Sequence, residues 1–170
     1  MPAPVVQVVA SVVTGEVMGV APDSHFDDVE FAMVEVFGAP DSDTGWIEGC
    51  PFDGLGDNER SMTWAGLRLD FRNDDGTPRY DGWSWRPGNP IPEGELPTDP
   101  QPDEWVIELH PGVTPDQTIA EVGAVTGFGT TDYLGFALVV DPDLWEFAYL
   151  SPDGEDAPVF EITSRLRFCD

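Results

Sequence analysis

The sequence predicts an α+β fold of two tandem modules, each a short helix or helical pair packed on an antiparallel sheet of about four strands. Three observations support this prediction: a repeated helix-entry segment, short runs of alternating apolar and polar residues, and a proline-rich stretch between the two copies. Strand runs that follow a helix in this way are typical of antiparallel α+β structure. A chain of 170 residues buries roughly 70% of its unfolded surface, which is enough for a substantial core.

An internal repeat is the most informative pattern in the chain. Residues 19–29 (GVAPDSHFDDV) align with residues 112–122 (GVTPDQTIAEV), which lie 93 positions further on. Gly, Val, Pro, Asp and the final Val are identical, and the Phe/Ile and Asp/Glu pairs are conservative. Self-similarity at a fixed spacing indicates repeated structural units, so we interpret the pattern as an internal duplication.

Each repeated segment predicts the start of a helix. Pro22 and Pro115 suit the first helical position, where the missing N–H has no cost. In the second copy Thr114 is expected to cap the helix, and Gln117 is expected to complete a capping box. Apolar residues then recur at helical spacing: Phe26, Val29, Met33, Val34 and Phe37 in the first copy, and Ile119, Val122 and Val125 in the second. Gly38 and Gly127 are expected to end the two helices.

Three strands are expected after each helix, because apolar and polar residues alternate there. They are 61–64, 67–71 and 80–85 in the first copy, and 136–140, 145–149 and 160–163 in the second. An Asp-Gly turn precedes the last strand of each set, at Asp75-Gly76 and Asp153-Gly154.

These elements predict a first module over residues 1–86, a linker over 87–104 and a second module over 105–170, which together could form one compact unit. Six prolines between 87 and 102 indicate an extended, semi-rigid linker. Residues 5–13 are apolar and rich in valine, and we interpret them as a strand rather than a signal peptide, because no positive residue precedes them. No membrane insertion is expected, since the sequence shows no long apolar segment.

The charge balance limits the partners. The chain has 33 acidic residues against 7 basic ones, for a net charge of −26. All seven cations are arginine. Binding to nucleic acid requires cations that neutralise phosphate, so nucleic acid is not expected as a partner. An acidic surface serves solubility first, and it also attracts proteins with a basic surface.

The two cysteines, Cys50 and Cys169, lack the close spacing of a zinc or thioredoxin-type site. They are either a disulfide or a pair of free thiols. A disulfide would close about 119 residues and stabilise the fold by roughly 4–5 kcal/mol on the chain-entropy model. We predict the disulfide if the protein is exported.

Aromatic and arginine residues give the best interaction signal. Trp83 and Trp85 share one face of the predicted strand, and Tyr80 has the opposite parity. The two indoles are either part of the core or an exposed patch beside Arg72 and Arg79. Trp and Arg are common hot-spot residues of protein interfaces, so we nominate these four residues as candidate interaction residues.

No residue pattern predicts chemistry. His25 and His110 have no serine or cysteine motif beside them, and both are expected as satisfied surface histidines. The acidic stretch 41–48 does not fit a calcium-binding loop, and the chain has no lysine for a phosphate-binding loop. We therefore predict no enzyme activity, no cofactor and no metal.

The segment 112–122 resembles the helix-entry motif of tandem-module secreted proteins related to beta-lactamase-inhibitory protein, and also small domains of bacterial envelope lipoproteins. This resemblance implies a helix-loop-helix on a four-stranded sheet, in exported, non-enzymatic proteins that present a sheet face to another protein. The chain departs from the inhibitor in having one cysteine per module, where the inhibitor has a disulfide in each. The Trp-rich hairpin and acidic surface are also similar to those of some bacterial toxin-immunity proteins.

Three functional hypotheses follow, of which one, an unrecognised hydrolase with a cleft lined by carboxylates, is not adopted because no residue pattern supports chemistry. The first is an exported or envelope-associated module of inhibitor type that binds another protein with a basic surface. The second is a cytoplasmic immunity protein or nucleic-acid mimic whose acidic surface blocks a basic partner.

Overall fold

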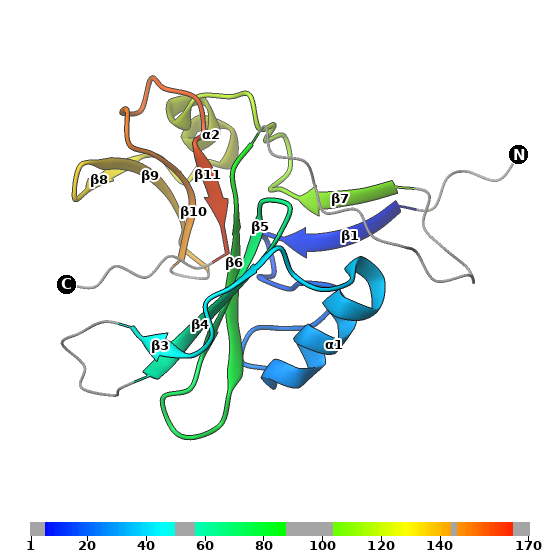
Figure 1. Ribbon diagram of the computed structural model, residues 1–170. Helices are drawn as coiled ribbons and strands as arrows, with labels where there is room; N and C mark the ends of the chain where they lie inside the picture. The colour runs from blue at the N-terminus through cyan, green and yellow to red at the C-terminus, as the bar shows by residue number, and fades with distance from the viewer. Residues whose placement is uncertain (1–5, 50–56, 88–103, 144–145, 165–170) are drawn as a thin grey trace, which may run out of the picture.

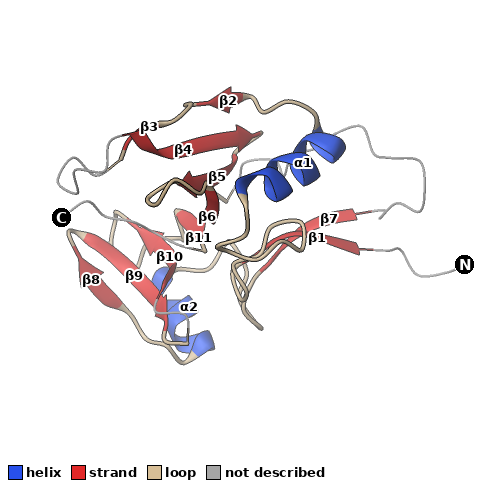
Figure 2. Cartoon of the chain, turned by 90° about the horizontal axis from the view of Figure 1, so that it is seen from below, coloured by secondary structure: helices blue, strands red, loops and turns tan. Residues whose placement is uncertain are grey.

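The computed structural model describes residues 6–49, 57–87, 104–143 and 146–164. Within these residues the fold is α+β, with two helices packed on a large antiparallel sheet (Figures 1 and 2). The helices are α1 (Phe26–Phe37) and α2 (Ile119–Thr126). The strands are β1 (Val6–Ser11), β2 (Ser42–Asp43), β3 (Ile47–Glu48), β4 (Asp57–Trp64), β5 (Leu67–Arg72), β6 (Arg79–Trp85), β7 (Glu104–Glu108), β8 (Thr131–Tyr133), β9 (Phe136–Asp141), β10 (Glu146–Ser151) and β11 (Glu161–Thr163).

The large sheet is continuous across the two predicted modules. Its strand order is β2-β4-β5-β6-β11-β10-β9-β8, and β3 also pairs with β4. The central contact is antiparallel, with Trp85 opposite Ile162 and Ser84 opposite Thr163. Ser164 N–H donates to the Trp83 carbonyl at 2.9 Å just beyond this pair. The two sets of strands therefore form one surface instead of two separate sheets.

A second, two-stranded sheet joins the same two parts of the chain. Strands β1 and β7 pair in parallel, and Ser11 lies opposite Glu108. The Ser11 hydroxyl donates to Glu108 Oε1 at 2.6 Å. The valine-rich strand expected at 5–13 is therefore confirmed as β1. Its partner β7 starts next to the predicted proline-rich linker, of which residues 88–103 lie outside the described residues.

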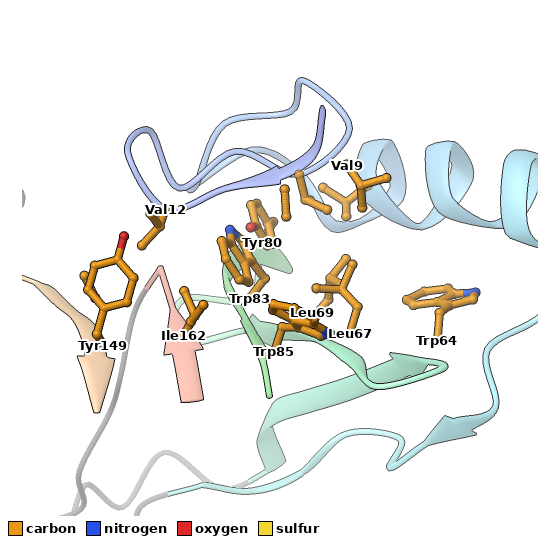
Figure 3. Packing of buried hydrophobic residues seen from close by; sticks show 14 of the residues in the cluster. Val9, Val12, Trp64, Leu67, Leu69, Tyr80, Trp83, Trp85, Tyr149 and Ile162 are labelled. Carbon is orange, nitrogen blue, oxygen red and sulfur yellow. The ribbon is translucent and has the colours of Figure 1, made fainter. Parts of the chain in front are cut away.

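One hydrophobic cluster fills the space between the large sheet, the helices and β1. Alternation in β5 works as predicted, because Leu67, Leu69 and Phe71 are buried while Arg68 is exposed. Figure 3 shows β1 and α1 above side chains that come from β4, β5, β6, β10 and β11. A single core thus holds residues from both predicted modules.

Both helices begin later than the prolines suggest. The N-caps are His25 and Thr118, each extended, so the predicted first-turn positions of Pro22 and Pro115 are wrong. Asp23 lies in the left-handed region (φ 68°), which cannot continue a helix. His25 forms an isolated bridge with Arg79 of β6, so contacts with the sheet hold the cap extended.

The capping box of the second helix is also displaced. It is formed by Thr118 and Glu121, whose side chains each accept the other's backbone N–H. Thr114 and Gln117, the predicted pair, form a turn before the helix, where Gln117 N–H donates to the Thr114 carbonyl. The predicted helix ends are confirmed, since Gly38 and Gly127 are the C-caps with φ of 75°.

Candidate interaction surface

The two candidate tryptophans are buried. Trp83 has no exposed surface and Trp85 is 8% exposed. Trp83 Nε1 donates to the Ser11 carbonyl at 3.1 Å, which ties β6 to the end of β1. Of the two alternatives that the sequence left open, the structure contains the core one, and the two indoles form no exposed patch beside Arg72 and Arg79.

Tyr80 departs from the predicted parity for a local reason. The register between β5 and β6 shifts at Asp70/Phe71, so that Phe71 lies opposite Tyr80 while Leu69 lies opposite Trp83. This irregularity turns the Tyr80 ring to the core face, where it is fully buried and its hydroxyl donates to the Gly15 carbonyl at 2.8 Å. Burial raises the pKa of Tyr80 well above its ordinary value.

Arg72 and Arg79 do come together, as cross-strand partners near the β5–β6 turn. Both are held by the segment before α1: Arg72 bonds the Asp23 carboxylate, and Arg79 donates to the Asp23 carbonyl at 3.1 Å. Arg72 also lies 3.5 Å from Asp81. Arg72 therefore neutralises nearby carboxylates, and both arginines tie the segment before α1 to the sheet.

The other described arginines are paired in the same way. Arg60 forms a two-point bond with Asp43 (2.9 and 2.6 Å), which lowers the pKa of that carboxyl. Arg68 lies 2.8 Å from Asp70, and Arg86 lies 3.1 Å from Glu161. Arg165 and Arg167 lie outside the described residues. Every described guanidinium thus has a carboxylate or carbonyl partner within the chain, and the many remaining acids leave the surface strongly negative.

Helix α1 combines exposed carboxylates with exposed apolar side chains. Its buried side consists of Phe26, Val29, Met33 and Phe37, as predicted. Val34 belongs to the predicted apolar stripe but is 40% exposed. Phe31 is 67% exposed, and it was not singled out from the sequence. The sequence FDDVEFAMVEVF contains more apolar residues than one buried helix face requires, and this surplus indicates that some of them are exposed.

His110 is buried, which corrects the prediction of a surface histidine. Its Nδ1 lies 2.9 Å from the Tyr149 hydroxyl and its Nε2 lies 2.8 Å from Asp141 Oδ2. The His110 backbone N–H also donates to the Tyr149 hydroxyl at 3.1 Å. Burial, aided by the negative charge of Asp141, raises the pKa of Tyr149 to about 12. Because both ring nitrogens bond groups of the chain itself, we assign this network a structural role. His25, in contrast, caps α1 and is about half exposed.

Cys50 and Cys169, the residues of the predicted disulfide, both lie outside the described residues. Among the residues that are described, no group of three or more His, Cys, Asp or Glu side chains has an arrangement that could hold a metal ion. Within the same residues, neither helix is long and apolar enough to cross a bilayer.

Comparisons with known proteins give no relative for this chain. No protein-family model matches it, and neither the curated proteins nor the solved structures include a significant match.

Proposed function

We propose that this chain is a non-enzymatic module that binds another protein through a basic surface of that partner, and that it acts outside the cell or in the envelope. The charge arrangement carries the proposal. The arginines of the described part are already engaged by Asp23, Asp43, Asp70 and Glu161 or by the Asp23 carbonyl, so they offer little to an anionic partner. The surplus carboxylates remain for cations outside the chain.

The negative electrostatic potential of such a surface accelerates association with a basic protein and selects against acidic partners. It also makes binding sensitive to salt, because exposed charges are screened over about 10 Å at 0.1 M ionic strength. The cytoplasmic alternative, an immunity-type inhibitor, uses the same surface chemistry and differs in compartment. Intact mass after alkylation in denaturant without reductant distinguishes the two: no label indicates a Cys50–Cys169 disulfide and export, whereas two labels indicate free thiols.

We also propose that the fold consists of two copies of one module, sharing a sheet and a core. Two backbone hydrogen bonds tie each helix-entry segment to the chain that follows the Asp-Gly turn, at or just before β6 and just before β11. They are Phe26 N to Pro78 O (3.0 Å) and Tyr80 N to Ser24 O (2.8 Å) in the first copy, and Ile119 N to Ala157 O (3.1 Å) and Val159 N to Gln117 O (3.0 Å) in the second.

Corresponding atoms in these bonds are 93 residues apart before the helices and 79 apart on the strands. Ser84 and Thr163, which pair at the centre of the sheet, are also 79 apart. Equivalent residues of two antiparallel strands therefore lie opposite each other, as expected around a local two-fold axis. The strand order supports the same interpretation, since it reads β2-β4-β5-β6 from one end and β8-β9-β10-β11 from the other.

The binding proposal is tested by capture of proteins on the immobilised chain, followed by titration of each purified candidate. We expect a stoichiometric partner with a basic surface, whose affinity falls at least about tenfold between 0.05 and 0.3 M NaCl as the screening length shortens. An acidic partner, or an affinity independent of salt, would contradict the proposal.

A further inference from the structure

The outer face of α1 is not needed to hold the helix on the sheet. Four buried side chains on the opposite face already anchor the helix to the core, and two of them, Val29 and Met33, have no exposed surface. Figures 1 and 2 show α1 at the periphery of the molecule, with one side toward the sheet and the other directed away from it. The 67% exposure of Phe31 and the 40% exposure of Val34 therefore have no packing explanation. A contiguous exposed apolar patch becomes a candidate interaction site when charged residues rim it.

Carboxylates surround this apolar pair. Asp27 and Asp28 precede Phe31 by four and three residues, and Glu35 follows it by four, so all three lie beside it on the helix surface. All three side chains are exposed. Glu35 lies near the C-terminal end of α1, where a negative charge opposes the helix dipole. Helix stability therefore does not explain its presence, whereas attraction of a cation does.

The second helix lacks the same feature. Given the spacing of 93 residues between the repeats, the positions equivalent to Phe31 and Val34 are Ala124 and Gly127. Helix α2 does expose Val125, which was predicted in its apolar stripe and is 47% exposed. Its apolar surface holds no exposed aromatic residue, so the large exposed ring is specific to α1, although the two helices enter the sheet through the same hydrogen bonds.

We propose that the face of α1 formed by Asp27, Asp28, Phe31, Val34 and Glu35 is a docking site for a cationic amphipathic helix of a partner protein. This inference rests on the proposed function and names the surface that performs it. The complementary ligand has an apolar stripe, which covers Phe31 and Val34, between two rows of Lys or Arg, which meet the carboxylates. Residues 27–35 span about 12 Å, or roughly two helical turns, which suits packing of one helix along another.

The test uses the full chain and two synthetic probe peptides of about 18 residues. In the first peptide, leucines form one helical stripe and lysines flank it. The second has the same lysines and carries serine in place of every leucine. Binding is measured by fluorescence anisotropy in about 0.1 M NaCl, where weak long-range attraction is partly screened.

We expect the lysine–leucine peptide to bind at least about tenfold more tightly than the lysine–serine peptide. Phe31→Ala, which introduces the residue that α2 carries at the equivalent position, is expected to remove most of this difference. Leu134→Ala is the matched control, because Leu134 is also 67% exposed but lies between β8 and β9. Circular dichroism of both variants checks that the fold is kept.

The outcomes separate the docking site from the general proposal. Equal binding of the two peptides, or equal losses for Phe31→Ala and Leu134→Ala, would overturn the α1 site and leave cation binding intact. Failure of both peptides to bind the wild-type chain would overturn the site together with the proposed function. A charge series completes the test: Asp28→Asn and Glu35→Gln are expected to weaken the lysine–leucine peptide more than Asp153→Asn, an exposed acid in the turn between β10 and β11.

Discussion

The buried Tyr149–His110–Asp141 network makes the free energy of unfolding depend on pH. The single substitution Tyr149→Phe separates the contribution of the Tyr149 hydroxyl from that of all other groups. The His110 backbone N–H donates to the Tyr149 hydroxyl, the same hydroxyl lies 2.9 Å from Nδ1, and Nε2 lies 2.8 Å from Asp141 Oδ2. Removal of the hydroxyl leaves the His110 N–H and Nδ1 without these partners. Each unpaired buried group costs about 1–3 kcal/mol, so for two such groups we expect the free energy of unfolding to fall by about 2–6 kcal/mol at pH 7.

The difference between wild type and Tyr149→Phe should narrow at high pH. The folded pKa of Tyr149 is about 12, raised from 10.0. The stabilising contribution is therefore complete below pH 10 and is lost as the pH rises toward 12, because the unfolded tyrosine releases its proton first. At pH 11 the wild type should have lost about 1.4 kcal/mol for this group, whereas the phenylalanine variant loses nothing there.

Urea unfolding followed by tryptophan fluorescence at pH 7 and pH 11 measures both effects. Leu134→Ala is the control, because Leu134 is 67% exposed between β8 and β9, and surface substitutions usually change stability by no more than about 0.5 kcal/mol. A gap between wild type and Tyr149→Phe that stays constant from pH 7 to pH 11 would refute the reasoning, as would a loss below about 1 kcal/mol at pH 7.

Three further predictions concern stability and are checked by thermal or urea unfolding. Thr118→Ala removes the N-cap of α2 and should cost about 1 kcal/mol, whereas Thr118→Ser should be nearly neutral. Gly123→Ala places a Cβ 2.9 Å from the backbone of Gly129, so overpacking of about 1–3 kcal/mol should outweigh the gain in helix propensity; a stabilised variant would show that the loop yields easily. Asp43→Asn breaks the bond to Arg60, which lowers the pKa of Asp43. The ion pair stabilises the fold above pH 3.8, the ordinary pKa of the carboxyl, and this stabilisation is lost as the pH falls below that value. Relative to wild type, the variant should therefore lose up to about 1 kcal/mol of unfolding free energy at pH 7 and nothing at pH 2. An equal loss at both pH values would contradict the ion pair.

The middle of the fold could be predicted from the sequence because its signals are local. Alternation placed β5, β6 and β10, a continuous apolar run placed β9, and the terminal glycines placed both helix ends. The short strands β2, β3 and β8 have two or three residues each, which is too few for a periodic pattern.

The parts that differed from prediction depend on contacts between distant residues. His25 and Thr118 are caps because β-bridges to Arg79 and Pro158 hold them extended, and no local pattern contains these bridges. Trp83 is buried because β1 covers the sheet and accepts its indole N–H at Ser11. Strand β1 has its partner about a hundred residues away, beyond the reach of any local pattern.

Of the candidate surface, the sequence could predict the negative charge but not the residues that form it. Composition identified an acidic protein, but it could not show that each described arginine is already paired. Exposure of Phe31 depends on how α1 is rotated on the sheet, and that rotation is set by the packing of Val29 and Met33.

The parallel pairing of β1 with β7 has a consequence for synthesis of the chain. The residues that join the two strands, Ser11 and Glu108, are 97 positions apart. At typical elongation rates of 5–20 residues per second, a ribosome needs about 5–20 s to make the partner of β1. During that interval the valine-rich strand β1 has no partner on the nascent chain. The edge of β6 that later pairs with β11 is also unpaired, because β11 is made later still. We therefore expect nascent chains that stop before residue 104 to depend on chaperones and to aggregate, while the complete chain stays soluble.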